Sequence, residues 1–173
     1  MRASFYIGLC LMLGLCLGCN KLPDPQFTFS TSVNFDIPPS LNTVETHYFT
    51  LPNTPTFIDL SLAQEGFTTD DITSIISQNA KFTEVDENIN LDFINSIVVN
   101  AYTLDENVEL FYLENIQFGN KEEIFLLASI SELVEILNED FVNFEVGIRF
   151  RQIPPSNFRA DVELDFSVYA EQQ

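Results

Sequence analysis

The two stretches that decide the fold are VNFEVGIRFR, residues 142–151, and FRADVELDFSV, residues 158–168. Apolar and polar side chains alternate through both stretches, a period of two that is typical of strands with one buried face. The apolar set comprises Val142, Phe144, Val146, Ile148, Phe150, Phe158, Ala160, Val162, Leu164, Phe166 and Val168. We therefore predict two antiparallel strands and expect Phe144, Ile148, Leu164 and Phe166 to lie in the core.

The segment IPPSN at residues 153–157 breaks the pattern between these two strands. If the strands pair directly as a hairpin, setting Arg149 against Glu163 and Arg151 against Asp161 keeps both apolar faces together. Cross-strand pairs of opposite charge contribute only about 0.2–1 kcal/mol each. Burial of the alternating face therefore decides the fold, and the charges adjust the register.

Similar patterns occur along the rest of the chain. Residues 27–37 alternate as a half-buried strand that stops at Pro38-Pro39, because proline cannot donate to a strand ladder. Further strands are expected within 44–51 and near 93–103, 108–113 and 123–128. These segments predict a mainly β domain, a two-sheet antiparallel β-sandwich of immunoglobulin-like or jelly-roll-like type with one or two short helices.

Two segments carry helix signals. In TPTFIDLSLAQEG, residues 54–66, Thr54 is placed as a cap, Pro55 at the first helical position and Gly66 at the stop. In SISELVEILNED, residues 129–140, Ser129 and Glu132 form a capping-box pattern before an apolar face. Residues 69–80 fit either a helix or a strand.

The composition is acidic and apolar at once. The formal net charge is −19, while 46% of the residues are hydrophobic and 17 of them are Phe. This much apolar character predicts a packed domain and not a disordered chain. The charge disfavours nucleic acid and anionic lipid as partners, because both require clustered Lys and Arg.

All three cysteines, Cys10, Cys16 and Cys19, lie in the first nineteen residues. Arg2 followed by an apolar run at residues 3–17 has the anatomy of an export signal, and the run is shorter than the roughly 20 residues of a membrane-spanning helix. The ending LGC at residues 17–19 resembles a bacterial lipoprotein signal. The resemblance implies acylation of the Cys19 thiol, with chains such as palmitate, and cleavage before this residue; an ordinary secretory signal is the alternative.

The lipoprotein hypothesis divides the chain into three parts: a signal peptide at residues 1–18, a lipidated Cys and tether at 19–26, and one β-sandwich domain at 27–173. Asn20 after the acylated residue favours delivery to the outer membrane. The sequence leaves open whether the domain faces the periplasm or the cell surface. The closing strands and the segment ISELVEIL also resemble small envelope lipoproteins of the Bacteroidota, which implies a β-sandwich ectodomain and supplies no catalytic residues.

Few residues qualify as a catalytic or metal site. His47 is the only histidine, no G-x-S-x-G elbow accompanies it, and a structural role is favoured. Asp86, Asn88, Asn90 and Asp92 alternate like a calcium-ligand loop. Leu91 and Ile97 replace the Gly and Glu that an EF-hand requires at these positions, so a solvated turn is the favoured interpretation.

Tyr102, Tyr112 and Tyr169 form an alternative hypothesis, an exposed surface on which sugar rings stack, although buried or rim tyrosines are the default. No cofactor motif is recognisable. The leading hypothesis is a non-catalytic, lipid-anchored envelope protein with a binding or structural domain, whose partner is an envelope protein or a glycan. The alternatives are a glycan hydrolase that uses two carboxylates and a subunit of a larger outer-membrane assembly.

Overall fold

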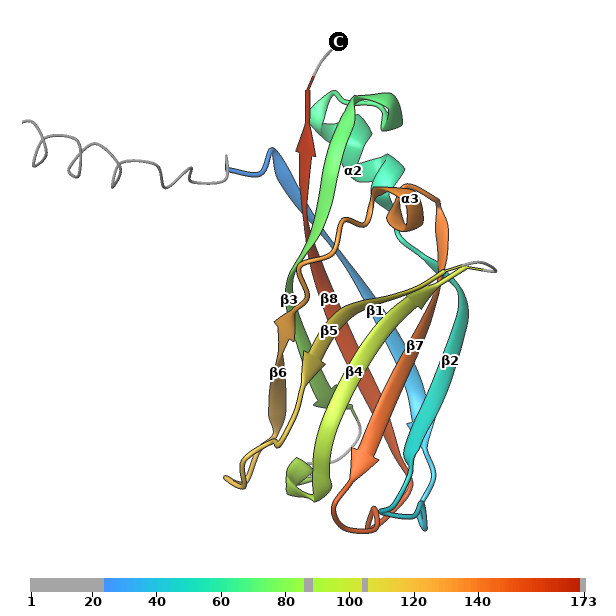
Figure 1. Cartoon of the computed structure of the whole chain (residues 1–173), viewed down its shortest axis with the longest axis vertical. Coiled ribbons are helices and arrows are strands. Elements are labelled where there is room, and N and C mark those ends of the chain that lie inside the picture. The colour runs from blue at the N-terminus through green and yellow to red at the C-terminus, as the bar shows by residue number, and fades with distance from the viewer. Residues whose placement is uncertain (1–23, 86–88, 104–105, 172–173) are drawn as a thin grey trace, which may run out of the picture.

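The computed structural model describes residues 24–85, 89–103 and 106–171. Eight strands run lengthwise through an elongated body (Figure 1). They are β1 (Phe27–Ile37), β2 (Thr46–Pro55), β3 (Ile72–Glu84), β4 (Ile94–Tyr102), β5 (Asn107–Leu113), β6 (Glu123–Ala128), β7 (Phe141–Phe150) and β8 (Phe158–Ala170). The helical segments are α2 (Ile58–Glu65), α3 (Val134–Leu137) and the short 3₁₀ turns Thr69–Asp71 and Leu91–Phe93.

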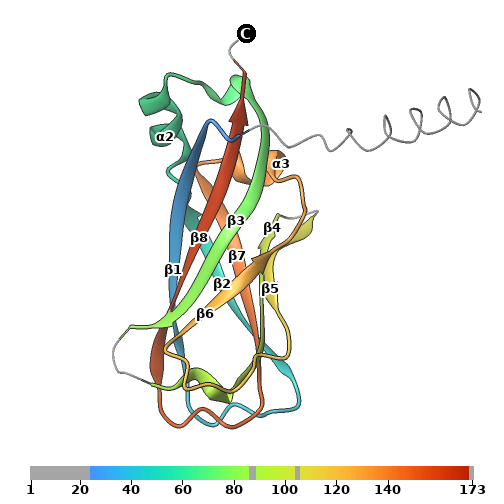
Figure 2. The same cartoon turned by 90° about the vertical axis from the view of Figure 1, so that its left-hand side faces the viewer.

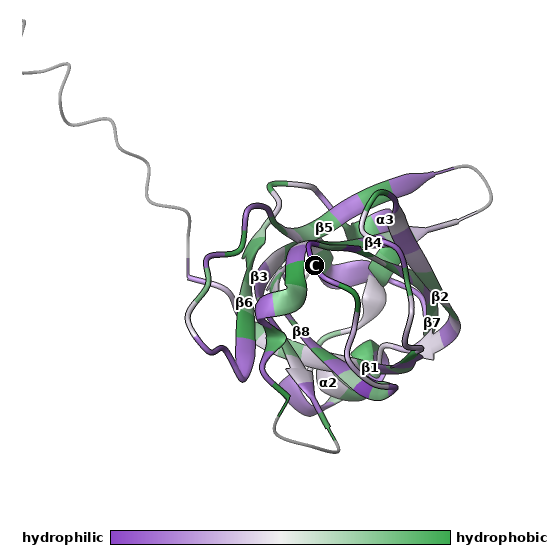
Figure 3. Cartoon of the chain, turned by 90° about the horizontal axis from the view of Figure 1, so that it is seen from below, coloured by the Kyte–Doolittle hydropathy of each residue, from purple (hydrophilic) through white to green (hydrophobic). Residues whose placement is uncertain are grey.

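The eight strands form one antiparallel sheet in the order β1-β8-β3-β6-β5-β4-β7-β2. The sheet curls until the edge strands β1 and β2 face each other, so the strands almost close a ring when seen along the long axis (Figure 3). The Thr31 hydroxyl donates to the Pro55 carbonyl across this seam at 2.9 Å, and the rings of Phe35 and Phe49 lie 4.8 Å apart beneath it. The mainly β, antiparallel prediction is confirmed.

The finer prediction of two separate sheets is not confirmed. Strand β6 pairs with β3 through residues 123–126 and with β5 through residues 127–128, and so joins the two halves. Figure 2 shows β6 running obliquely between them. Below, the upper end of the barrel is the end where β1 begins and β8 finishes, beside α2 and α3, and the lower end is the opposite one.

The alternating residues of β7 and β8 fill the core as predicted. Phe144, Ile148, Leu164 and Phe166 are all fully buried. The Phe166 ring stacks on Phe29 with centroids 5.1 Å apart and meets Phe111 at 5.7 Å. Because these rings come from β8, β1 and β5, the alternating face unites strands that are distant in the sequence.

The predicted hairpin between β7 and β8 is wrong. Strand β8 pairs with β1 and β3, while β7 pairs with β4 and β2. Glu163 consequently forms its ion pair with Lys81 of β3, at 3.0 Å, and not with Arg149. An alternating strand presents the same faces to any antiparallel neighbour, so the pattern alone does not select the partner.

Strand β1 and the later strands match their predicted ranges closely, but the first helix does not. Strand β2 continues through Pro55, and α2 begins at Ile58 before ending at the predicted Gly66. The reason is that Thr56 is held by residues next to β7: its N–H donates to the Asp140 carbonyl and its hydroxyl to the Glu139 carbonyl, at 2.7 Å. Pro55 is tolerated because β2 is an edge strand.

The second helix is much shorter than predicted, and α3 comprises only one turn. The Glu132 carboxylate does not take part in a capping box with Ser129. It accepts hydrogen bonds from the Ser74 hydroxyl at 2.7 Å and from the Ile75 and Leu133 backbone N–H groups at 2.9 and 3.0 Å. These bonds fasten Glu132 to β3, and residues 129–133 form no helix. The segment at 69–80 is resolved as a 3₁₀ turn followed by β3.

Among the described residues, no helix has the length and apolar character that crossing a bilayer requires.

Candidate functional site

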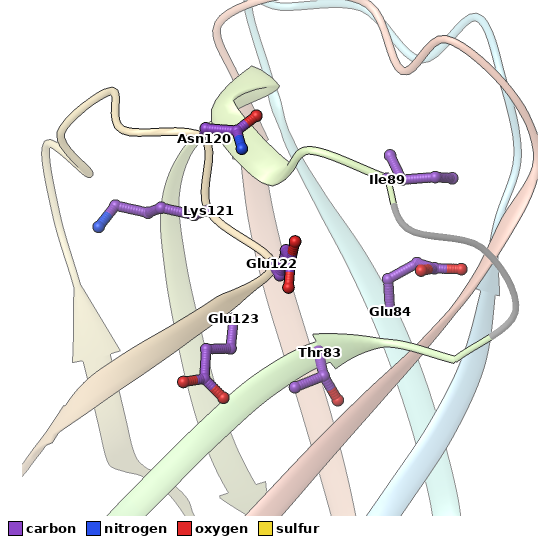
Figure 4. A pocket seen from close by; sticks show the side chains of 7 residues that line it. All are labelled: Thr83, Glu84, Ile89, Asn120, Lys121, Glu122 and Glu123. Atoms are coloured by element: carbon purple, nitrogen blue, oxygen red, sulfur yellow. The ribbon is translucent and has the colours of Figure 1, made fainter.

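An open pocket of about 560 Å³ lies at the lower end, between the end of β3 and the start of β6. Its walls carry three carboxylates, Glu84, Glu122 and Glu123, beside a single base, Lys121. Figure 4 shows the Lys121 side chain extending away from Glu84. The pocket is therefore acidic, and it borders the segment in which the calcium loop was predicted.

Asp92, the last residue of that predicted loop, supports the neighbouring backbone. Its carboxylate accepts hydrogen bonds from the N–H groups of Gly119 at 3.0 Å and Asn120 at 2.9 Å, and from the Asn90 side-chain amide at 3.2 Å. The backbone hydrogen bond from Asn120 is the main cause that lowers the pKa of Asp92. The interactions of Asp92 thus anchor the turn that follows β5.

The calcium hypothesis stays a prediction. Asp86 and Asn88 lie outside the described residues, as does Cys19, the predicted site of lipidation. Within the ranges that the structure describes, no group of three or more His, Cys, Asp or Glu side chains is arranged to hold a metal ion.

His47 has structural partners. Its Nε2 atom lies 2.9 Å from the carbonyl oxygen of Asn42, and its ring lies 5.7 Å from the Phe150 ring. Both contacts fix the connection between β1 and β2 to the barrel wall. This placement agrees with the structural role favoured from the sequence.

The three tyrosines proposed as a sugar-stacking surface do not gather in one place. Tyr102 lines a groove beside α3, and Tyr169 lines a different pocket with Ile130 and Glu132. Tyr112 lies on the outer face of β5. Tyr112 is part of an apolar surface on the outer face of the sheet.

Five residues in register form a row across the outer face of the sheet, from β2 through β7, β4 and β5 to β6. Each is the direct cross-strand partner of the next: Tyr48, Gly147, Val98, Tyr112 and Leu127. We call this set the outer row. Tyr48 is 58% exposed and Leu127 54%, and Phe125, two residues before Leu127 on the same face of β6, is 62% exposed.

Gly147 allows the outer row to pack flat against the sheet. A Cβ atom at this position would lie 2.8 Å from Cε1 of Tyr48 and 2.8 Å from Cγ1 of Val98. The Tyr48 ring therefore packs over the Gly147 backbone, beside the Val98 side chain. This surface was not predicted from the sequence, although a glycine inside an alternating strand is a known sign of close approach.

Two carboxyl groups outside these surfaces have raised pKa values. Partial burial, the neighbouring Asp140 carboxylate and a hydrogen bond shared with it raise the pKa of Asp59. Burial and the nearby charge of Glu163 raise the pKa of Asp161 on β8. Asp59 and Asp140 are both exposed to solvent, and because they share a hydrogen bond they lie closer together than the roughly 5–10 Å that separates the two carboxylates of a glycan hydrolase.

No protein-family model and no curated protein matches the chain. A solved structure from Desmodium yellow mottle tymovirus is similar over 91% of this chain and 95% of that chain, with 11% sequence identity and a TM-score of 0.29. A TM-score this low supports no argument about the fold or the function.

Proposed function

We propose that this protein is a lipid-anchored binding protein of the bacterial envelope and that its partner binds to the outer row. The observation that carries the proposal is the alignment of the exposed Tyr48, Tyr112 and Leu127 with the half-buried Val98, in a row that crosses five strands through Gly147. Contiguous apolar side chains on a sheet face that is otherwise polar mark interaction sites, whereas isolated ones are ordinary.

The chemistry of the outer row favours a protein partner. Its side chains are aromatic and aliphatic, with Phe125 at its end, and the centre of protein interfaces is enriched in such groups. A glycan site would need directed hydrogen-bonding groups among the aromatic rings. The hydrolase alternative has no comparable support, because Asp59 and Asp140 lie exposed and apart from the row.

The anchor rests on the N-terminal sequence, where Cys19 follows an apolar run and a glycine. The outer membrane is the proposed location because Asn20 follows Cys19. We also propose that the two halves of the curled sheet pack on each other as a β-sandwich. The contact between the rings of Phe166 in β8 and Phe111 in β5, 5.7 Å apart across the core, supports this arrangement.

Site-specific photo-crosslinking in cells that make the protein tests the proposed surface. A photoreactive benzoylphenylalanine replaces Tyr112 in one variant and Leu127 in another. The matched control replaces Gln78, which is also exposed and lies on β3 in the other half of the barrel. All three positions project from strands, so the probe reaches the same distance from the backbone.

We expect the same adduct with a protein of defined mass at Tyr112 and Leu127, and no such adduct at Gln78. Adducts at all three positions, or at Gln78 alone, contradict the proposal. An adduct whose mass is removed by glycosidase and not by protease shows a glycan partner, and the proposed class of partner is then wrong.

A further inference from the structure

The charges of the barrel are distributed unequally between its ends. The described basic residues all lie in the lower part of the strands or in the lower loops, namely Lys81, Lys121, Arg149, Arg151 and Arg159. The upper end carries many acids, namely Asp24, Asp59, Glu65, Asp70, Asp71, Glu106, Glu109, Glu132, Glu135, Glu139, Asp140 and Glu171. Within the described ranges, the upper end is therefore negative without any neighbouring base.

A groove of about 380 Å³ opens at this end, between the last residue of β4, the first residues of β7 and α3. Ile136 and Val142 are buried in its floor. Tyr102 and Phe141 form aromatic walls, and the Phe141 side chain is 62% exposed. Such an exposed ring at a strand end has no role in the core.

Two carboxylates border the same groove. Glu135 and Glu139 stand four residues apart, at the start of α3 and just after its end, and both line the groove. Neither forms an ion pair with any residue that the structure describes. The groove therefore combines an apolar floor, two aromatic rings and two carboxylates that lack a cation.

We propose that this groove binds the Arg or Lys side chain of a basic segment of a partner protein. A cation is attracted to the face of an aromatic ring within about 6 Å of its centroid, and a guanidinium also donates hydrogen bonds to carboxylates. The floor accepts the methylene stem of the same side chain. This inference concerns a site distinct from the outer row and does not depend on it.

Charge complementarity selects this occupant over the alternatives. An anionic membrane surface or a nucleic acid meets repulsion at this end, where the described residues include many acids and no base. A second copy of the chain, with a net charge of −19, would bring like charges together. A basic segment is attracted from a distance and then held by the groove.

The test uses the purified full chain and two fluorescent probes, a capped tri-arginine peptide and the capped tri-citrulline peptide, which has nearly the same shape without the charge. Binding is measured by anisotropy at low ionic strength. One variant combines Glu135→Gln and Glu139→Gln, and a second is Phe141→Ala, which truncates an exposed ring and leaves the core intact. The matched control combines Glu65→Gln and Glu171→Gln, which removes the same charge from the upper end outside the groove.

We expect the tri-arginine peptide to bind at least tenfold more tightly than the citrulline peptide. The Glu135→Gln/Glu139→Gln variant and Phe141→Ala should each weaken it by about tenfold, and the control variant by less than twofold. Equal losses in the groove and control variants overturn the proposal, since binding is then unspecific attraction to a negative end. Equal binding of the two peptides, or full affinity in Phe141→Ala, overturns it as well.

Discussion

The substitution Gly147→Ala probes the packing of the outer row directly. The added methyl group would lie 2.8 Å from carbon atoms of both Tyr48 and Val98. Carbon atoms in favourable contact are about 3.5–4.0 Å apart, so each contact is short by roughly 1 Å. Val98 is branched at Cβ and stiff, so the Tyr48 ring must swing away from the sheet.

We expect this substitution to lower the free energy of unfolding by about 1–2 kcal/mol. The estimate combines an overpacking cost of about 1–3 kcal/mol with a gain of about 0.5–1 kcal/mol from replacing glycine in a strand. In a Tyr48→Ala background the cost should fall by about half, because the contact with Val98 persists while the contact with the ring is gone.

The assay is urea unfolding followed by far-UV circular dichroism, which suits a chain without Trp. Gly119→Ala is the matched control, because a Cβ atom there meets nothing within 4 Å. We expect the control to change the free energy by less than about 0.5 kcal/mol. If Gly147→Ala is as stable as the control, Tyr48 is not packed on the sheet and the reasoning about the outer row is refuted.

Three other predictions concern stability. Phe166→Ala should lower the free energy of unfolding by about 3–5 kcal/mol, as a truncation in a closed core, and a loss below 1 kcal/mol in urea unfolding contradicts the core assignment. Melting curves should show stability rising as the pH falls from neutrality through the raised pKa of Asp161, since a raised pKa means that the fold favours the protonated form of this group. Stability should fall again as the pH drops below the unfolded values of 3.8 for Asp92 and 4.5 for Glu132, whose pKa values the fold lowers. A monotonic rise of stability with pH from 4 to 7 contradicts the sign at Asp161, and stability that keeps rising as the pH falls below 3.8 contradicts the signs at Asp92 and Glu132. Added NaCl at pH 7 should raise the melting temperature by screening repulsion, and an unchanged temperature shows that specific pairing dominates.

Much of the fold could be predicted from alternation alone. Strands β1, β7 and β8 bury every second residue, so their extent and core face are readable from the sequence. The partners of β7 and β8 were not predictable, because an alternating strand fits any antiparallel neighbour. Contacts with distant residues also overrode the local helix signals. Thr56 donates a hydrogen bond to the Glu139 carbonyl just before β7, and the Glu132 carboxylate accepts one from Ile75 of β3.

The candidate surfaces were harder to predict than the fold. The outer row joins Tyr48, Val98, Tyr112 and Leu127, and the groove joins Tyr102 with Phe141, so each requires the strand order before its residues become neighbours. An outward aromatic residue in an alternating strand is also uninformative by itself, since exposed apolar residues are common. Gly147 was the only local sign of the packing above it.

Lipid anchoring at Cys19 is tested most directly by intact mass spectrometry. The protein is expressed in a host that processes lipoproteins and is purified from its membranes. We expect a mature chain that begins at Cys19 and carries the added mass of a diacylglyceryl group on its thiol. This mass should disappear in Cys19→Ala, and that protein should leave the membrane fraction or stay unprocessed. A mature chain that begins at another residue, or an unmodified Cys19 thiol in membrane-bound protein, would show that the protein is not anchored through a lipid at Cys19.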